Sequence, residues 1–235
     1  FMSPFSFLRR PALWMEVIDK VRGTHTAAPN FGYEHVVSKT TPRERKSWDL
    51  SSLRVAMVAA EPVRATTIER FVAAFADSRL APGAMCPAYG LAEHTVGVTM
   101  GGTRRGAFDQ QALRAGKLEL AADGAEAQWL VGCGSVAESV DVRIVDSEHA
   151  RELPAGHVGE VWVTSASKAD GYFGRPDLSR ATFEAKLGDE RGYLRTGDLG
   201  AMFDGELFIV GRLKDLVILQ GRNVHPHDVE DAVRG

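Results

Sequence analysis

The most constraining feature of this sequence is a short, almost wholly apolar run, Leu53–Ala59, followed by Ala60-Glu61-Pro62 and then by a helical pattern. A run of this length and composition predicts a strand buried on both faces of a parallel sheet. The helical pattern consists of four apolar side chains that share one stripe: Ile68, Phe71, Val72 and Phe75. A buried strand, a loop and an amphipathic helix in this order predict an α/β fold with a parallel sheet.

Similar patterns predict the elements around this unit. Apolar residues at helical spacing indicate helices over residues 11–22 and 31–37. Residues 101–128 are rich in Gly, Ala and charge, and we expect a long excursion there with one short helix near Gln110–Ala115. Beyond it, the patterns predict strands over 140–145, 158–163 and 217–219, a β-hairpin at Asp204-Gly205, and a helix from Pro226.

These patterns divide the chain into a parallel half and an antiparallel half. We expect a parallel α/β subdomain over residues 1–130 with an inserted segment at 101–131, and a β-rich subdomain over 132–212. Residues 213–235 then form a hinge and the start of a further domain. The sequence opens on Phe1 and closes part-way through a helical pattern. We therefore expect it to be a piece of a longer protein.

The composition excludes several classes of protein. Of the 235 residues, 44% are hydrophobic and 25% charged, which is typical of a globular domain. No apolar stretch reaches the ~18 residues that a membrane span needs. The 28 Lys and Arg residues oppose 31 Asp and Glu residues, and a net charge of −3 offers no basic surface for nucleic acid. Cys86 and Cys133 are too few for a disulfide framework or a four-ligand zinc site, so we expect buried thiols and a cytoplasmic location.

Four segments place polar residues and glycines at strand ends, where α/β folds usually carry their sites. Each segment alone also fits an ordinary strand exit, a turn or a solvent-exposed cation, so only their joint occurrence in this order points to a shared site. They are Ala59-Ala60-Glu61-Pro62, Tyr89-Gly90-Leu91-Ala92-Glu93, Arg195-Thr196-Gly197-Asp198, and Gly211-Arg212-Leu213-Lys214-Asp215 with the stretch 221–226.

With these segments in this order, the chain resembles the adenylate-forming superfamily and, within it, the fatty acyl-AMP ligases. Pro29-Asn30-Phe31 and Gly171-Tyr172-Phe173-Gly174-Arg175-Pro176 also carry the resemblance, which covers essentially the whole chain. Residues 101–131 look like the extra segment that distinguishes acyl-AMP ligases from acyl-CoA synthetases. The resemblance implies that a fatty acid attacks the α-phosphate of ATP and leaves an acyl-adenylate. It also implies that an acyl carrier protein, rather than coenzyme A, then accepts the acyl group.

The resemblance further implies roles for single residues. Glu93 would bind Mg²⁺, a hard cation that prefers oxygen ligands, and Asp198 would accept hydrogen bonds from both ribose hydroxyls. Arg212 would reach the ribose or a phosphate with its five donors. Lys214 would act at the hinge, although a solvated lysine fits its position equally well. Contacts to ATP or AMP would also come from Ala59, Ala60, Glu61, Pro62, Tyr89, Gly90, Leu91, Ala92 and Ile209.

The acyl site would lie near Asn30 and Phe31, although a helix start with a core Phe fits these two residues equally well. No role follows for His94. Ala59 stands where relatives of this kind carry glycine, and the chain contains neither their phosphate loop nor their catalytic lysine. We therefore expect this chain alone to be inactive.

Other functions remain open at this point. The chain also fits an acyl-CoA synthetase or another adenylate-forming ligase, and it fits a truncated, non-catalytic module that binds a nucleotide or an acyl chain. A Rossmann oxidoreductase is excluded because no Gly-x-Gly-x-x-Gly follows a strand.

Overall fold

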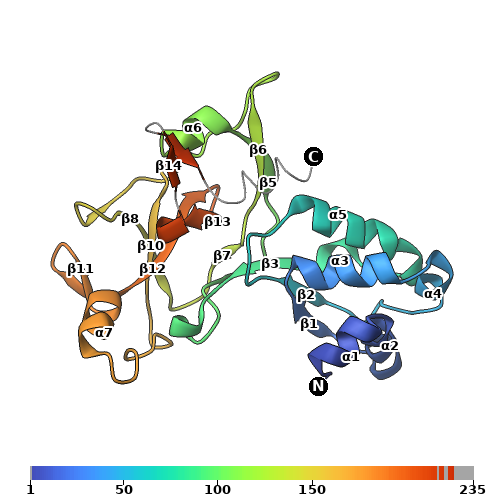
Figure 1. Cartoon of the computed structure of the whole chain (residues 1–235). Coiled ribbons are helices and arrows are strands. Elements are labelled where there is room, and N and C mark those ends of the chain that lie inside the picture. The colour runs from blue at the N-terminus through green and yellow to red at the C-terminus, as the bar shows by residue number, and fades with distance from the viewer. Residues whose placement is uncertain (1, 216, 220–221, 225–235) are drawn as a thin grey trace. The chain divides into compact units, whose positions relative to one another are not determined.

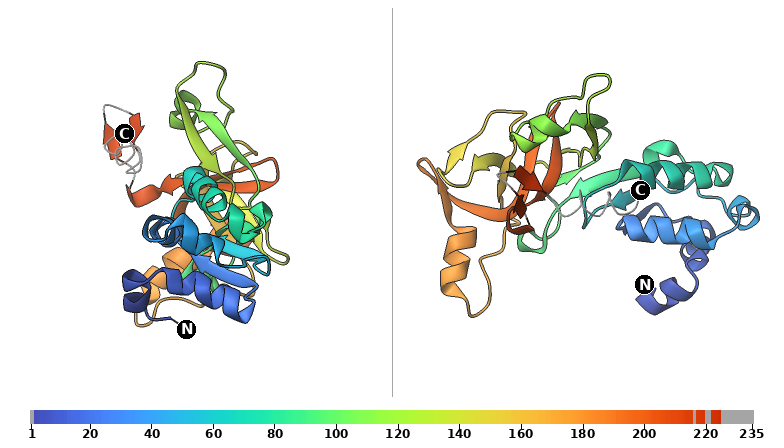
Figure 2. Two further views of the ribbon diagram at one scale, coloured as in Figure 1. Left: turned by 90° about the vertical axis from the view of Figure 1, so that its right-hand side faces the viewer. Right: turned by 45° about the horizontal axis from the view of Figure 1, so that its top comes forward.

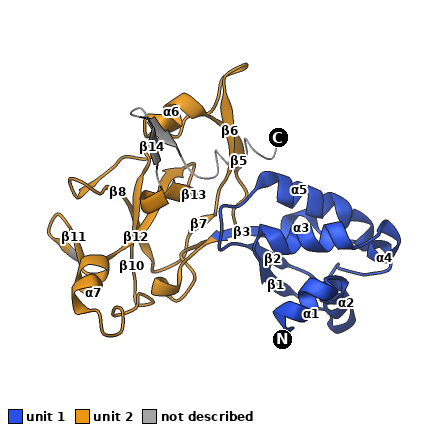
Figure 3. Ribbon diagram, viewed as in Figure 1, with its two compact units in different colours: residues 1–88 blue, residues 89–235 orange. Residues whose placement is uncertain are grey.

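The computed structural model describes residues 2–215, 217–219 and 222–224. The chain divides into two compact units, Phe1–Ala88 and Tyr89–Gly235, which Figure 3 colours separately. This division falls earlier in the chain than the subdomain boundary expected at residue 130. A compact unit and a family subdomain need not coincide, so the expected subdomains stay a prediction.

Unit 1 contains a parallel sheet packed with helices (Figure 1). Strand β2 Val55–Val58 pairs in parallel with β1 His25–Ala28 and with β3 Met85–Tyr89, whose last residue begins unit 2. This confirms the parallel strand predicted within Leu53–Ala59, although only every second residue of β2 is fully buried. The helical elements, which include all three predicted helices, are α1 Pro4–Arg9, α2 Ala12–Val21, α3 Asn30–Lys39, α4 Pro42–Lys46, α5 Ala65–Ala74, η1 Ala76–Ser78 and η2 Pro82–Ala84.

The core of unit 1 forms where the apolar stripes of the helices meet the sheet. Met15 of α2, Tyr33 of α3 and Phe71 of α5 are each at most 1% exposed and belong to one apolar cluster. The Tyr33 ring meets the Phe71 ring edge-on at 4.9 Å, and its hydroxyl donates a 2.7 Å hydrogen bond to the Met57 carbonyl oxygen of β2. Helices α3 and α5 accordingly lie side by side in both Figure 1 and Figure 2.

Unit 2 is built on a six-stranded antiparallel sheet, so the predicted α/β fold with a parallel and an antiparallel part is confirmed. Its longest strand, β12 Glu190–Phe203, pairs with β10 Gly159–Thr164, β11 Ala185–Leu187 and β13 Glu206–Arg212. Strands β8 Asp141–Asp146 and β9 Arg151–Glu152 complete the sheet. The other elements of unit 2 are β4 Thr99–Met100, β5 Arg105–Asp109, β6 Ala127–Val131, β7 Ser135–Val136, β14 Val217–Leu219, β15 Arg222–Val224, α6 Gln110–Arg114, α7 Pro176–Phe183, η3 Ala92–His94 and η4 Leu213–Asp215.

The hairpin predicted at Asp204-Gly205 is confirmed. These two residues connect β12 to β13, and both have positive φ, 49° for Asp204 and 80° for Gly205. Two successive residues in the left-handed region match the twist of the flanking strands, which is why Asp-Gly is favoured there. This short turn brings the polar ends of β12 and β13 into register with each other.

The excursion predicted over residues 101–128 has more structure than the sequence indicated. The short helix is confirmed as α6, but strands β5 and β6 on either side of it were not predicted. These strands pair antiparallel, with Arg105 opposite Val131. Gly106 and Ala107 weaken the alternation of β5, and its partner lies about twenty residues further along the chain. The helix predicted from Pro226 lies outside the described residues.

Both cysteines are buried free thiols, as expected, with Cys86 9% and Cys133 4% exposed. The cytoplasmic location that their small number suggested stays a prediction. Among the residues that the structure describes, no helix is both long enough and apolar enough to cross a bilayer.

Candidate active site

Asp198 reaches its position through an irregularity in strand β12. Between the paired positions Glu160–Leu199 and Trp162–Arg195, β12 contains two more residues than β10. Gly197 lies in this bulge with φ +71°, a conformation that side chains other than glycine rarely adopt. The Thr196 hydroxyl donates to the Val161 carbonyl oxygen (2.7 Å) and accepts from the Asp198 amide (3.0 Å). The Thr-Gly pair thus forms the turn that presents Asp198.

The Asp198 carboxylate is buried and held by two side chains. Arg212 lies directly opposite it on β13, and the Arg212 Nε atom donates a 2.7 Å hydrogen bond to Oδ1. The Tyr89 hydroxyl, from the end of β3, donates a 2.7 Å hydrogen bond to Oδ2. Only 8% of the Asp198 side chain is exposed, whereas half of the Arg212 side chain is. Since a carboxylate has about four acceptor positions, Asp198 retains capacity for two further donors.

The electrostatics of this trio follow from the burial and from the ion pair. Burial first, and the adjacent Asp198 charge second, raise the pKa of Tyr89 far above its ordinary value. The hydrogen bond from Arg212 to Asp198 raises the pKa of the arginine. Tyr89 therefore stays protonated and acts as a donor, while Arg212 stays charged beside the Asp198 carboxylate.

Glu160 supports the turn that carries Asp198, a role that no sequence pattern predicted. It is 2% exposed, and its carboxylate accepts hydrogen bonds from Arg195 Nη2 (2.7 Å) and from the Gly197 amide (3.2 Å). The Trp162 indole also donates to Glu160, at 2.9 Å, and the Arg195 guanidinium lies 5.5 Å from the centre of the Trp162 ring. The only signal in the sequence was a single acidic residue within an otherwise apolar strand.

Glu93, the predicted magnesium ligand, lies in the short helical turn η3 and is half-buried. The Tyr172 hydroxyl donates a 2.9 Å hydrogen bond to its Oε1 atom. Within the described part of the chain, no group of three or more His, Cys, Asp and Glu side chains could hold a metal by itself. A single carboxylate with one occupied oxygen still suits Mg²⁺, because this ion usually takes one or two protein carboxylates and completes its shell with phosphate oxygens and water.

Gly90 has a structural role beside its predicted contact to the nucleotide, which stays a prediction. A Cβ atom at this position would lie 1.4 Å from the Val96 carbonyl oxygen. Glycine is thus required because residues 90 and 96 of the same loop approach each other, whatever the loop binds. Leu91 and Ile209 pack against an apolar cluster of unit 2, Ala92 is exposed, and Lys214 is exposed in η4. Their contacts to a nucleotide, and the hinge role of Lys214, stay predictions.

The predicted site residues of unit 1 form a group of their own around Asn30. Asn30 is 1% exposed, and its amide group donates to the Pro62 carbonyl oxygen (2.9 Å) and accepts from the Arg64 amide (3.0 Å). The Phe31 amide donates to the Glu61 carboxylate at 3.3 Å. The first residues of α3 therefore hold the loop that follows β2, in which Ala60 has a φ of +73°. Ala59 is half-buried in this loop, and Ala60, Glu61 and Pro62 are exposed.

Asn30 and Phe31 differ in how available their side chains are to a ligand. Both hydrogen-bonding groups of the Asn30 side chain are used within the protein. The Phe31 ring is 51% exposed and stacks on His35 at 5.3 Å, so it is not the core side chain considered as the alternative. Phe31 is thus the more accessible of the two for an acyl chain.

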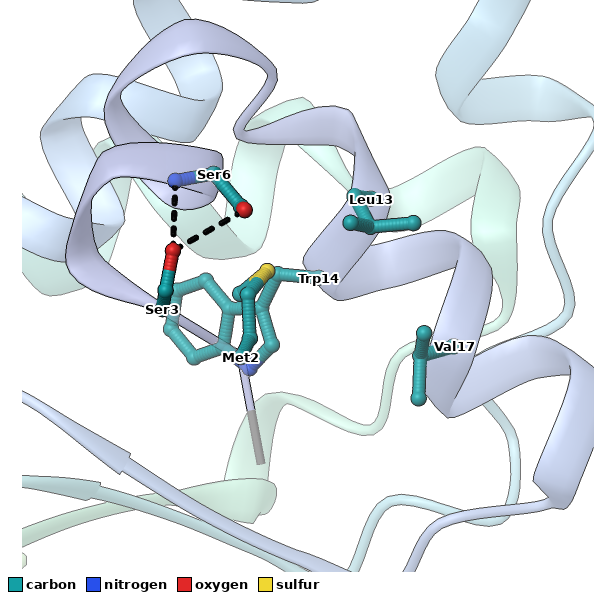
Figure 4. A pocket seen from close by; sticks show the side chains of 6 residues that line it. All are labelled: Met2, Ser3, Ser6, Leu13, Trp14 and Val17. Atoms are coloured by element: carbon teal, nitrogen blue, oxygen red, sulfur yellow. Dashed lines mark hydrogen bonds between the residues drawn. The ribbon is translucent and has the colours of Figure 1, made fainter.

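A separate cavity of about 300 Å³ lies in unit 1 between α1 and α2 (Figure 4). It is lined by Met2, Ser3, Ser6, Leu13, Trp14 and Val17. The two serine hydroxyls lie 3.0 Å apart and bond to each other, and the Ser6 amide donates to Ser3. No lining side chain carries a charge, and the sequence singled out no chemistry there, so this cavity is not the candidate active site.

The comparisons with known proteins agree with the predicted resemblance. The family model of the AMP-binding enzymes matches residues 1–173. The chain is 43% identical to a 4-hydroxyphenylalkanoate adenylyltransferase of Mycobacterium marinum, covering 99% of this chain and 39% of that protein. It is 40% identical to the medium-chain-fatty-acid–[acyl-carrier-protein] ligase JamA of Moorena producens, covering 97% of this chain and 40% of the relative.

Solved structures show the same similarity. A fatty acyl-adenylate ligase from L. pneumophila, in complex with acyl adenylate and pyrophosphate, matches with a TM-score of 0.86 at 37% identity. The match covers 99% of this chain and 42% of that one. The chain therefore spans about two fifths of the length of the relatives it matches.

Proposed function

Because the chain belongs to the family of AMP-binding enzymes, we propose that the complete gene product containing these 235 residues activates a fatty acid with ATP. In this reaction a carboxylate oxygen of the acid forms a bond to the α-phosphorus of ATP. The bond between that phosphorus and the oxygen bridging to the β-phosphate breaks, and pyrophosphate leaves. The product is an acyl-adenylate, a mixed anhydride that can acylate a second substrate.

The observation that carries this proposal is the buried carboxylate of Asp198 between Tyr89 and Arg212. A ribose offers two adjacent hydroxyl donors, and Asp198 has two acceptor positions left for them. Arg212, half exposed and permanently charged, can reach the ribose or a phosphate while Nε stays on Asp198, because its two terminal nitrogens carry four further donors. Tyr89 and Ile209 would support the adenine, and the resemblance implies a further contact from the backbone at Ala59–Pro62.

Glu93 is the residue of this site that suits Mg²⁺. When bound, the ion supplies positive charge that neutralises phosphate oxygens. Glu93 contributes a hard oxygen ligand and is kept in place by Tyr172. Asn30 and Phe31 would lie near the acyl chain, and Lys214 would be the hinge at which a further domain turns between two reaction poses.

The acyl acceptor is proposed to be the phosphopantetheine of an acyl carrier protein. The name of the Moorena relative, an acyl-carrier-protein ligase, supports this choice. Coenzyme A is the alternative, and turnover with coenzyme A in the absence of a carrier protein would decide for it. The Mycobacterium relative is named for 4-hydroxyphenylalkanoates, so aryl-substituted alkanoic acids are a second candidate substrate class beside plain fatty acids.

The test is ATP–pyrophosphate exchange, measured on the complete gene product with a panel of fatty and aryl-alkanoic acids. We expect acid-dependent exchange that Asp198→Ala reduces by roughly 100-fold or more, the scale seen when a preorganised site loses a key polar group. Asp204→Asn, in the exposed turn of the same hairpin, is the matched control and keeps full activity. Unchanged exchange in Asp198→Ala would refute the proposed role of this carboxylate.

The second candidate function is that of a non-catalytic module that binds a nucleotide or an acyl chain. Calorimetric titration with a non-hydrolysable acyl-adenylate analogue, together with the ATP–pyrophosphate exchange assay, distinguishes this module from an enzyme. Binding without any exchange by the complete gene product would favour the module.

A further inference from the structure

We infer that residues 165–172, which follow strand β10, are a positioning segment for the turn that carries Glu93, with His94 as its buried centre and Tyr172 as the residue that orients the Glu93 carboxylate. The inference deepens the proposed function, because it concerns the predicted cation ligand. The contacts themselves lie wholly within unit 2.

Four hydrogen bonds join the two segments, although they are more than seventy residues apart in the sequence. Two of them fix the backbone: the Ala169 amide donates to the Glu93 carbonyl oxygen (2.9 Å), and the Thr95 hydroxyl donates to the Ser167 carbonyl oxygen (2.7 Å). The other two are side-chain pairs, His94 with Ser165 at 2.7 Å and Tyr172 with Glu93 at 2.9 Å. Residues 93, 94 and 95 are thus all attached to the same segment.

His94 is completely buried, and its partners define its tautomer. Nδ1 lies 3.0 Å from the Gly97 carbonyl oxygen, which can only accept, so Nδ1 carries the proton. In the neutral ring Nε2 then accepts from the Ser165 hydroxyl at 2.7 Å. The Ser165 oxygen in turn accepts from the Ser167 amide at 3.0 Å. The His94 imidazole therefore connects the end of the Glu93 turn with the start of the positioning segment.

The turn needs such support because its backbone is strained. Thr95 and Val96 follow Glu93 and His94, and both have positive φ, 54° and 86°. Both are β-branched, the side-chain type for which this region is least favourable. Such conformations persist only where the surroundings impose them. Here the surroundings are the buried His94 and the hydrogen bonds from residues 165–169.

Tyr172 acts on the functional end of the turn. Its hydroxyl occupies Oε1 of Glu93, and no other hydrogen bond to this carboxylate occurs among the described residues, so Oε2 remains available to a cation. Tyr172 is itself held, since its amide donates to Ser179 of α7 (2.8 Å) and its ring meets Phe183 edge-on at 5.1 Å. A fixed donor of this kind orients a metal-ligating carboxylate, and its loss typically weakens metal binding 10- to 100-fold.

The first experiment replaces Tyr172 with Phe, which removes one hydroxyl and preserves the ring. We expect Tyr172→Phe to raise the Mg²⁺ concentration for half-maximal ATP–pyrophosphate exchange about tenfold, with an unchanged KM for the acid. Direct titration of Mn²⁺ with ATP and the protein, followed by electron paramagnetic resonance, should show the same weakening without turnover. Tyr193→Phe is the matched control, because the Tyr193 hydroxyl also donates to carboxylates, those of Asp141 and Glu190, in the same unit.

The second experiment tests the positioning segment without any nucleotide or metal. Amide hydrogen exchange of the Val96 and Ala169 amides reports on the turn and on its attachment to residues 165–169. We expect Ser165→Ala to accelerate hydrogen exchange at both amides together, by about tenfold for the loss of one buried hydrogen bond. His94→Ala should accelerate it further, because it removes two hydrogen bonds and a buried ring. His149→Ala, at an exposed histidine of the same unit, should leave both rates unchanged.

These two experiments separate failure of the inference from failure of the proposed function. If the wild-type protein shows no acid-dependent ATP–pyrophosphate exchange, the proposed function is refuted. The positioning segment is still supported if Ser165→Ala accelerates hydrogen exchange at the Val96 and Ala169 amides. If both amides exchange as in the wild type in Ser165→Ala and His94→Ala, the inference is overturned. The inference is also overturned if the enzyme is active and Tyr172→Phe leaves the Mg²⁺ concentration for half-maximal ATP–pyrophosphate exchange unchanged.

Discussion

Tyr89 donates a 2.7 Å hydrogen bond to Asp198, although 109 residues separate them in the sequence. Tyr89 ends a strand of the parallel sheet, and Asp198 lies in the bulge of the longest antiparallel strand. The bond joins the predicted adenine support to the predicted ribose acceptor. Because the Asp198 carboxylate is buried, we expect both of its donors, Tyr89 and Arg212, to contribute to the stability of unit 2 as well as to nucleotide binding.

Tyr89→Phe should destabilise the protein and weaken nucleotide binding. The variant leaves one oxygen of a buried carboxylate without its donor, and hydrogen bonds to charged groups contribute about 1.5–3 kcal/mol. Urea unfolding measures the loss, and titration with AMP should show roughly tenfold weaker binding. Tyr33→Phe, which removes a bond to a neutral carbonyl in unit 1, should cost only about 0.5–1.5 kcal/mol. Unaltered AMP affinity in Tyr89→Phe would contradict a shared nucleotide site.

Glu160→Gln should loosen the turn that presents Asp198. The amide cannot compensate the Arg195 charge, and we expect a loss of roughly 1.5–3 kcal/mol in the free energy of unfolding. We also expect the KM for ATP to rise, because the single acceptor oxygen of glutamine cannot serve Arg195, Trp162 and Gly197 together, and Asp198 becomes less well oriented. The control is Glu152→Gln, whose partner Arg143 lies at the surface, where such pairs contribute about 0–1 kcal/mol. Equal effects of the two substitutions would argue against a special role for Glu160.

Asn30→Ala distinguishes a loop-holding residue from an acyl-binding one. If Asn30 holds residues 62–64, its removal frees the Arg64 amide, whose exchange should accelerate about tenfold, and the KM for ATP should rise. Phe31→Leu keeps these hydrogen bonds and changes the exposed ring, so it should alter the KM for the acid instead. A change confined to the acid KM in Asn30→Ala would assign Asn30 to the acyl site.

Gly90→Ala should be among the most damaging single-methyl additions in unit 2. The new Cβ would meet the Val96 carbonyl oxygen at 1.4 Å, so the backbone of the loop must move. We expect a loss of about 3 kcal/mol or more, at the upper end for overpacking. Gly97→Ala adds the same methyl group where nothing lies within 4 Å, and its effect should stay within about 0.5 kcal/mol. Thermal unfolding of both variants provides the comparison.

Cys133 should be unreactive at neutral pH and should make stability decline in alkali. Burial raises the pKa of its thiol from 9.0 to about 12. The unfolded thiol then ionises first, so its contribution to stability is complete below pH 9 and is lost as the pH rises toward 12. Urea unfolding over this range should show a shallower decline in Cys133→Ala. Peptide mapping after thiol labelling at pH 7 should find Cys133 unmodified in the folded protein, and rapid labelling there would contradict the burial.

The amino-acid sequence alone determined most of the local elements and the residue types of the candidate site. Asp204-Gly205 predicted its hairpin because two residues with positive φ restrict the turn to a few side chains. The run Leu53–Ala59 predicted its strand because a buried parallel strand must be apolar on both faces. Asp198, Arg212 and Glu93 were predicted because the order of the motifs resembles that of the adenylate-forming enzymes and because their side chains suit the chemistry, and their roles stay predictions.

Only the tertiary structure decided which of these residues contact one another and which hydrogen-bond partners keep them in place. Tyr89 lies 109 residues from Asp198, Tyr172 lies 79 from Glu93, and Pro62 lies 32 from Asn30 along the chain, and no local pattern encodes such distances. Tyr172, His94 and Glu160 were invisible as positioning residues, because a hydroxyl, a ring or a carboxylate acquires that role only when burial removes water and supplies one particular partner. Position 90 likewise requires glycine only in the folded protein, because the loop brings the carbonyl of Val96, six residues further on, close to it.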